Sequence, residues 1–208
     1  VALEKEIKGK GSVDDAVFRV VRDAFKESSP IRFEGNGYSE EWVQEAKKRG
    51  LLNLARTPDA LAQLRTPHAK QLFSRLGIMT ETELDSRYHV RLERYIKDIL
   101  IEAHTLREMV DTFVVPSALT YAGELARSAA AAAQAGIKSV PHVAEANRIG
   151  DMIEQLETHR AALRKACTKA GAMHDEEKLA QYLTTQVRDI MLEVRNCCDA
   201  LEMALPDE

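Results

Sequence analysis

The chain has 208 residues, of which 45% are hydrophobic, 30% charged and 5% aromatic, and its formal net charge at pH 7 is −4. Abundant alanine with sparse aromatic residues favours closely packed helices over a β-sandwich. The acidic balance argues against a nucleic-acid partner, because such a partner requires a basic face that displaces counterions.

The sequence contains no candidate membrane span. Its longest stretch without a charged residue, Thr112–Gly123, has 12 residues and contains Pro116. A spanning helix needs about 20 apolar residues, so we expect no membrane partner. The chain begins with valine rather than methionine, and we expect it to be a piece of a longer protein.

Short helices are predicted in the first 80 residues. Ser12 is a good N-cap for a helix that ends before Pro30, and Ser39 caps a second helix that ends at Gly50. Two Thr-Pro pairs, at 57–58 and 66–67, place proline at the first position of two further helices, where its missing N–H is tolerated.

The Gly-Asn-Gly at 35–37 raises the possibility of a phosphate-binding loop. A dinucleotide fingerprint needs a third glycine at the position that Glu40 occupies, and Glu41 adds a second carboxylate that would repel a phosphate. A P-loop would also need a terminal Gly-Lys-Ser/Thr. We therefore interpret the segment as a turn that starts a helix, with Gly35 and Gly37 at positive φ.

A long helix is predicted after Thr80, which forms a capping box with Glu83. Apolar residues then recur at spacings of three and four, as in a helix with one buried face; they are Leu84, Tyr88, Leu92, Tyr95, Ile99, Ala103, Leu106, Val110 and Phe113. The pattern continues to Gly136. Pro116 removes one backbone donor, so we expect a kink or a break there.

Two more helices, at 141–171 and 175–205, are predicted to pair in antiparallel fashion because only a short turn separates them. We expect residues 117–136 to be the third member of a three-helix bundle. The fold class is therefore all-α: short helices, a long kinked helix and an antiparallel helical pair.

The predicted helical arrangement also determines whether the cysteines can form a disulfide. The chain has three, Cys167, Cys197 and Cys198, and an odd number suits a reducing compartment. In the predicted hairpin Cys167 and Cys197 are offset by about 27 Å, whereas a disulfide needs Cα atoms within about 7 Å. We predict three free, metal-free thiols, a buried structural pair at 197–198, and a cytoplasmic protein.

Histidines offer little evidence of chemistry. His89 with Glu93, and His104 with Glu108, have the i,i+4 spacing of a shared metal site. The Glu-x-x-His and His-Glu-x-x-His motifs of helical metal enzymes do not occur. We therefore interpret these histidines as surface or cap residues, and we assign no catalytic, cofactor-binding or metal-ligating residue in this chain.

Several blocks in register nevertheless resemble one family. They are GNGYSEEW (35–42), EAKKRGLLNL (45–54), TPDAL (57–61) and MTETELDSRYHVRLERYIKDILIEAHTL (79–106). Together with the alanine-rich helix and the two helices after it, they resemble the C-terminal region of type III glutamine synthetases over essentially the whole chain. His104 and the segment 62–70 depart from the pattern.

The resemblance implies a parent enzyme that condenses glutamate and ammonia with ATP, using Mg or Mn, in an active site shared between subunits. Its catalytic residues lie in a β-rich domain upstream, so none is carried over to this chain. By this resemblance residues 1–30 are the tail of the catalytic domain, 31–80 a connecting region and 81–208 a C-terminal helical bundle. The implied partners are the protein's own catalytic domain and neighbouring subunits of a homo-oligomer.

Two other readings remain open at this point. One is a stand-alone helical adaptor or signalling bundle whose exposed stripe on Tyr88–Ile99 binds a partner helix. The other is a helical metal enzyme built on the His/Glu pairs. In the synthetase reading the same stripe packs on the catalytic domain or on a neighbouring subunit.

Overall fold

A computed structural model describes residues 12–138 and 140–206 of the chain. Within these ranges the chain forms helices and no strand, which confirms the all-α fold class. The chain divides into two compact units between Ala55 and Arg56. Each unit is described by itself.

The first unit contains α2 (Val13–Glu27), a 3-10 turn (Ser29–Ile31) and α3 (Glu40–Lys48). Both helices begin at the predicted caps, because the hydroxyl oxygens of Ser12 and Ser39 accept hydrogen bonds from backbone amides three residues ahead, at 3.4 and 3.3 Å. Gly50 follows α3 with φ of +74°, a conformation that favours glycine.

The second unit holds the longer helices. They are α4 (Thr57–Ala62), a 3-10 turn (Gln63–Arg65), α5 (Pro67–Arg75), α6 (Glu81–Met109), the π turn η3 (Val110–Val114), α7 (Val115–Gln134), α8 (Val140–Gly171), α9 (Glu176–Tyr182), the π turn η4 (Leu183–Val187) and α10 (Arg188–Glu202). The capping box predicted at Thr80 is present, with both of its hydrogen bonds.

The long helix is neither broken nor sharply interrupted at Pro116. Instead, the π turn η3 lies just before the proline, and the amide of Val115 donates to the carbonyl of Val110, five residues back. A π turn inserts one extra residue into a helix, and this local widening accommodates the proline, which has no N–H to donate. The chain therefore continues directly from α6 through η3 into α7.

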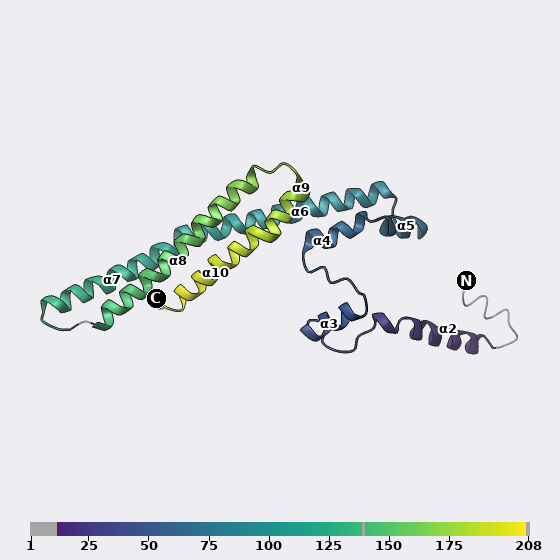
Figure 1. Cartoon of the computed structure of the whole chain (residues 1–208), viewed down its shortest axis with the longest axis horizontal. Coiled ribbons are helices and arrows are strands. Elements are labelled where there is room, and N and C mark those ends of the chain that lie inside the picture. The colour runs from purple at the N-terminus through teal and green to yellow at the C-terminus, as the bar shows by residue number, and fades with distance from the viewer. Residues whose placement is uncertain (1–11, 139, 207–208) are drawn as a thin grey trace. The chain divides into compact units, whose positions relative to one another are not determined.

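The predicted antiparallel pair is confirmed, and the expected third helix, α7, packs on α8 but makes no comparable contact with α10. Figure 1 shows α8 running beside α7 and beside α10, and these two helices make the most extensive contacts with α8. Residues 117–136 pack on α8, whereas α10 lies against α6 and η3. The three-helix section therefore consists of α6–η3, α8 and α10, and the α7–α8 hairpin extends beyond it.

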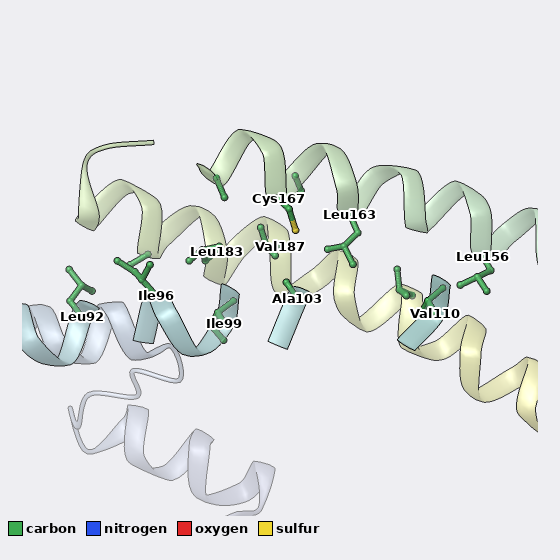
Figure 2. Close-up of a cluster of buried hydrophobic side chains, with 14 of the residues drawn as sticks. Leu92, Ile96, Ile99, Ala103, Val110, Leu156, Leu163, Cys167, Leu183 and Val187 are labelled. Atoms are coloured by element: carbon green, nitrogen blue, oxygen red, sulfur yellow. The ribbon is translucent and has the colours of Figure 1, made fainter. Parts of the chain in front are cut away.

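Side-chain size explains why α10 packs on α6 and not on α7. Helix α6 buries Leu92, Ile96 and Ile99, whereas the alanine-rich α7 buries only Val115 and Ala118. Larger aliphatic side chains remove more apolar surface from water when a neighbouring helix covers them. In Figure 2 the buried side chains of α6 share one core with Leu183 and Val187 of η4 and with Leu163 and Cys167 of α8.

From the packing of the core we predict that a buried and an exposed alanine substitution differ in their effect on stability. Leu163 on α8 is 1% exposed, and we expect Leu163→Ala to lower the free energy of unfolding by about 2–5 kcal/mol, because it removes buried methyl groups and leaves a cavity. Val90 on α6 is 60% exposed, and Val90→Ala should change it by less than about 0.5 kcal/mol. Urea unfolding followed by far-UV circular dichroism measures both. Equal effects would contradict the packing described for α8.

A polar clamp joins η3 to α8. Asp111 accepts hydrogen bonds from the guanidinium groups of Arg160 and Arg164, the second at 3.1 Å. Partial burial alone would raise the pKa of Asp111, but the two arginine hydrogen bonds outweigh it and the pKa is lowered. The ionised form of Asp111 is therefore the form that the folded bundle favours.

This clamp gives stability a defined pH dependence. Because the pKa of Asp111 is lower in the folded chain, its contribution is present above the unfolded value of about 3.9 and is lost as pH falls through the folded value. We expect Asp111→Asn to be less stable than the parent chain at pH 7 and the difference to shrink steadily below about pH 4. Urea titrations at pH 7, 5, 4 and 3 measure it, and a difference that grows on acidification would contradict the assignment.

Candidate functional site

The Gly-Asn-Gly segment is a turn that leads into α3, as predicted. The side chain of Asn36 accepts a hydrogen bond from the amide of Tyr38 at 3.0 Å, and the hydroxyl of Ser39 donates to the carbonyl of Asn36 at 2.9 Å. These local hydrogen bonds form an Asx-type turn that is closed on itself. The segment therefore starts a helix, and its polar groups are engaged with one another.

The predicted positive φ of Gly35 and Gly37 is wrong. Among the described glycines only Gly50, Gly77 and Gly136 have positive φ. Gly35 is constrained by space instead, since a Cβ there would lie 2.4 Å from the ring of Phe33. That ring stacks on Trp42 with centroids 4.3 Å apart, so a larger residue at 35 would displace the stack.

Two arginines next to this turn have structural partners. A small cavity of about 300 Å³ is lined by Ser29, Arg32, Phe33, Glu34 and Arg49. The guanidinium of Arg49 donates to the carbonyls of Arg32 and Pro30 and to Glu45, while Arg32 donates to the carbonyl of Phe25 at 2.6 Å. Both cations therefore tie main-chain segments of the first unit together.

The two His/Glu pairs do not assemble into a ligand set. Glu93 pairs with Lys97 at 2.6 Å, and His89 lies 3.7 Å from Glu176 instead of sharing a site with Glu93. In the ranges that the structure describes, no group of three or more His, Cys, Asp or Glu side chains is placed to hold a metal ion.

The stripe Tyr88–Ile99 lies inside the molecule, so its predicted exposure is wrong. Tyr88, Leu92, Ile96 and Ile99 are between 1% and 7% exposed and belong to the core. Its half-buried member, Tyr95, forms a 2.6 Å hydrogen bond between its hydroxyl and that of Thr184, a buried residue of η4. This stripe packs against α9 and η4, and it cannot receive a partner helix.

A different apolar surface is open, and we call it the α6–α10 groove. It has a volume of about 1580 Å³ and lies between the α6–η3–α7 run and the η4–α10 run. Four of its lining side chains, Ile101, Met109, Phe113 and Leu192, are 51–67% exposed. Large exposed apolar side chains gathered along one groove are a mark of an interaction surface.

A second apolar surface lies on α2 in the first unit. Val13, Val17, Val21 and Phe25 recur at every fourth residue, and Phe18 lies beside them; all five are 38–80% exposed. A helix with this pattern normally buries its apolar face against another body. The described residues thus present two exposed apolar surfaces and no assembled catalytic constellation.

Comparison with known proteins identifies the family. The model of the "Glutamine synthetase C-terminal domain" matches residues 16–133, which is more than half of the chain. The chain belongs to the glutamine synthetase C-terminal domain family. The matched range covers part of each unit described above, since it begins in α2 and ends in α7.

Curated relatives extend the similarity over nearly the whole chain. A glutamine synthetase of Bacteroides fragilis is 34% identical over 204 residues, which cover 94% of this chain and 28% of the relative. The type-3 glutamine synthetase of Dictyostelium discoideum is 30% identical over 91% of the chain and 27% of its own length. A glutamine synthetase of Butyrivibrio fibrisolvens is also 30% identical, over 93% and 28%. The chain therefore spans just over a quarter of the length of these relatives.

The described residues bear on two predictions, that the chain has no membrane span and that its thiols are free. In the described ranges no helix is long and apolar enough to cross a membrane. All three cysteines are free, as predicted, with Cys167 buried. The pair Cys197–Cys198 was expected to be buried, but both side chains are half-buried, and Cys198 lines the α6–α10 groove.

The local environment makes Cys198 a poor nucleophile. Burial raises the pKa of its thiol to about 11, and the neighbouring Cys197, Asp199 and Glu202 add to the effect. Because the thiolate is the reactive form, fewer molecules are reactive at neutral pH than for a free cysteine with a pKa of about 8.5. Burial also raises the pKa of Cys197.

We therefore expect slow alkylation at Cys198. At pH 8 its rate with iodoacetamide should be at least about tenfold lower in the folded chain than in urea. Timed labelling followed by peptide mass spectrometry measures each thiol separately, and Cys198→Ser confirms the peptide assignment. Rapid modification of Cys198 in the folded chain would contradict the raised pKa.

Proposed function

We propose that this domain has a structural and assembly role in a type III glutamine synthetase, an enzyme that condenses glutamate and ammonia with ATP. The observation that carries the proposal is the alignment itself: more than 90% of this chain matches about 28% of relatives that are named glutamine synthetases. The remaining length of such relatives has room for the catalytic domain that the resemblance places upstream.

The interactions of the carboxylates support a structural role for this domain, with catalysis in the upstream domain. Phosphoryl transfer from ATP requires divalent metal and cationic groups held around the phosphates. Here several carboxylates form ion pairs within the helical scaffold, as Asp111 does with Arg160 and Glu145 does with Arg148. We assign ATP and the Mg or Mn ions to the upstream domain of the parent enzyme.

The partition of the chain is part of the proposal. We assign residues 1–30 to the end of the catalytic domain, 31–80 to a connecting region and 81–208 to the helical bundle. The exposed apolar stripe of α2 supports the first assignment, since it needs an apolar surface to cover it. We propose the catalytic domain of the same protein as that surface, neighbouring subunits of a homo-oligomer as further partners, and the cytoplasm as the location.

The proposal predicts that the 208-residue chain alone makes no glutamine. ATP-dependent γ-glutamyl transfer should be undetectable with the isolated chain and present in the full-length parent. A parent that lacks the region equivalent to 56–208 should lose its normal assembled size, as measured by sedimentation, and should lose activity with it.

A matched control separates assembly from chemistry. A parent carrying the exposed substitution Val90→Asp should keep both size and activity. Glutamine formation by the isolated chain, or a truncated parent with normal size and activity, would overturn the assigned role.

A further inference from the structure

The α6–α10 groove lacks one wall of a closed helical bundle. Its floor contains the partly buried Leu106, Val114 and Met191, and its rims carry the exposed Ile101, Met109, Phe113 and Leu192. Among the described residues, three polar side-chain atoms are buried without a partner, and none belongs to a residue that lines the groove. An apolar groove of this kind suits a helix with exposed apolar side chains.

The order of residues along one rim is self-complementary. Six groove residues on the α6–η3–α7 run form three size-matched pairs about position 111: Ile101 with Tyr121, Thr105 with Ser117, and Met109 with Phe113. In an antiparallel pair of identical helices, residues equidistant from the two-fold axis face each other. Large side chains would therefore meet large ones, and the two small hydroxyl residues would meet at the positions between them.

Asp189, Arg195, Asp199 and Glu202 line the opposite wall together with Arg188, and Arg188 is the one charge that the same symmetry matches here. Helices α6 and α10 run in the same direction (Figure 1), and the hydrogen bond between Tyr95 and Thr184 sets their offset at 89 residues. Arg188 is thus level with residue 99, and a two-fold axis at 111 brings it to residue 123 of a second copy, next to Glu124. In the described part of the chain Arg188 has no ion pair, and Glu124 has only a 3.9 Å contact with Arg127.

The size of the surface is sufficient for a dimer. From Ile101 to Tyr121 the helical run extends about 30 Å at 1.5 Å per residue, and two adjacent helices are about 20 Å wide. The face therefore has an area of about 600 Å² per copy, or about 1,200 Å² in total, which is the lower limit for a specific interface.

We propose that the α6–α10 groove binds the same groove of a second copy of this chain in an antiparallel, two-fold arrangement. The Ile101–Met109–Phe113 rim of each copy lies in the groove of the other, and Arg188 of each pairs with Glu124 of the other. This proposal rests on the assembly role given above and names its surface. It is tested on the 208-residue chain, so it can fail while the parent enzyme still depends on its C-terminal domain.

Sedimentation equilibrium of the chain at roughly 1–200 μM tests self-association. We expect a monomer–dimer equilibrium with a micromolar dissociation constant, typical of a small interface. Phe113→Asp should weaken it by at least about tenfold, since it places a charge at the centre of the apolar contact. Val90, on α6 of the same helical run, is 60% exposed against 67% for Phe113 and does not line the groove, so Val90→Asp should leave the dimer unchanged.

A charge exchange tests the register. Arg188→Glu and Glu124→Arg should each weaken the dimer by roughly three- to tenfold, and the double variant should recover to within about threefold of the parent chain. Circular dichroism verifies that each variant remains helical. A chain that stays monomeric at 200 μM, a dimer insensitive to Phe113→Asp, or a double variant as weak as the single ones would overturn the proposal, and the first result would favour the catalytic domain as the occupant.

Discussion

The second unit depends on one apolar seam along α8. Ile149, Leu156, Leu163 and Ala170 are each seven residues apart, and none is more than 1% exposed. A seven-residue repeat places these side chains on one line down a helix of 32 residues, about 48 Å long. No single neighbour covers that length: α7 packs on α8 in the hairpin, whereas α6, η4 and α10 contribute to the shared core. Different helices therefore cover different parts of this apolar line on α8.

Sequence periodicity predicted which side chains are buried better than it predicted what covers them. The spacing of Leu84, Tyr88 and Leu92 correctly indicated one buried face, but periodicity is the same whether the covering helix belongs to the same chain or to a partner. Pro116 pointed to an irregularity, and the π turn was found next to it. The second π turn, Leu-Thr-Thr-Gln-Val at 183–187, contains no proline or glycine, so no local signal could have revealed it.

The α6–α10 groove could not be predicted because it is created by tertiary packing. Its two walls are about 89 residues apart in the sequence, and each wall alone resembles an ordinary helix surface. Gly35 illustrates a related limit: sequence indicated a special glycine, but a crowded aromatic ring, rather than a positive φ, is what requires it. Polar groups of the helix caps, by contrast, are satisfied by residues three positions away, and this is why the cap positions were predicted accurately.

The paired π turns have a consequence for insertions and deletions. Each π turn contains one residue more than the α-helical path needs. The turn η4 contacts α6, and the turn η3 contacts α10. Deleting one residue from η3 would allow regular α-helix to form with α6 and α7 still in nearly their present positions. Deleting a residue from the regular α-helix of α6 would instead rotate everything after it by about 100°, and the alanine face of α7 would turn away from α8 although no buried side chain had been substituted. The two π turns are therefore the positions in these helices at which natural variants should lose a single residue most readily.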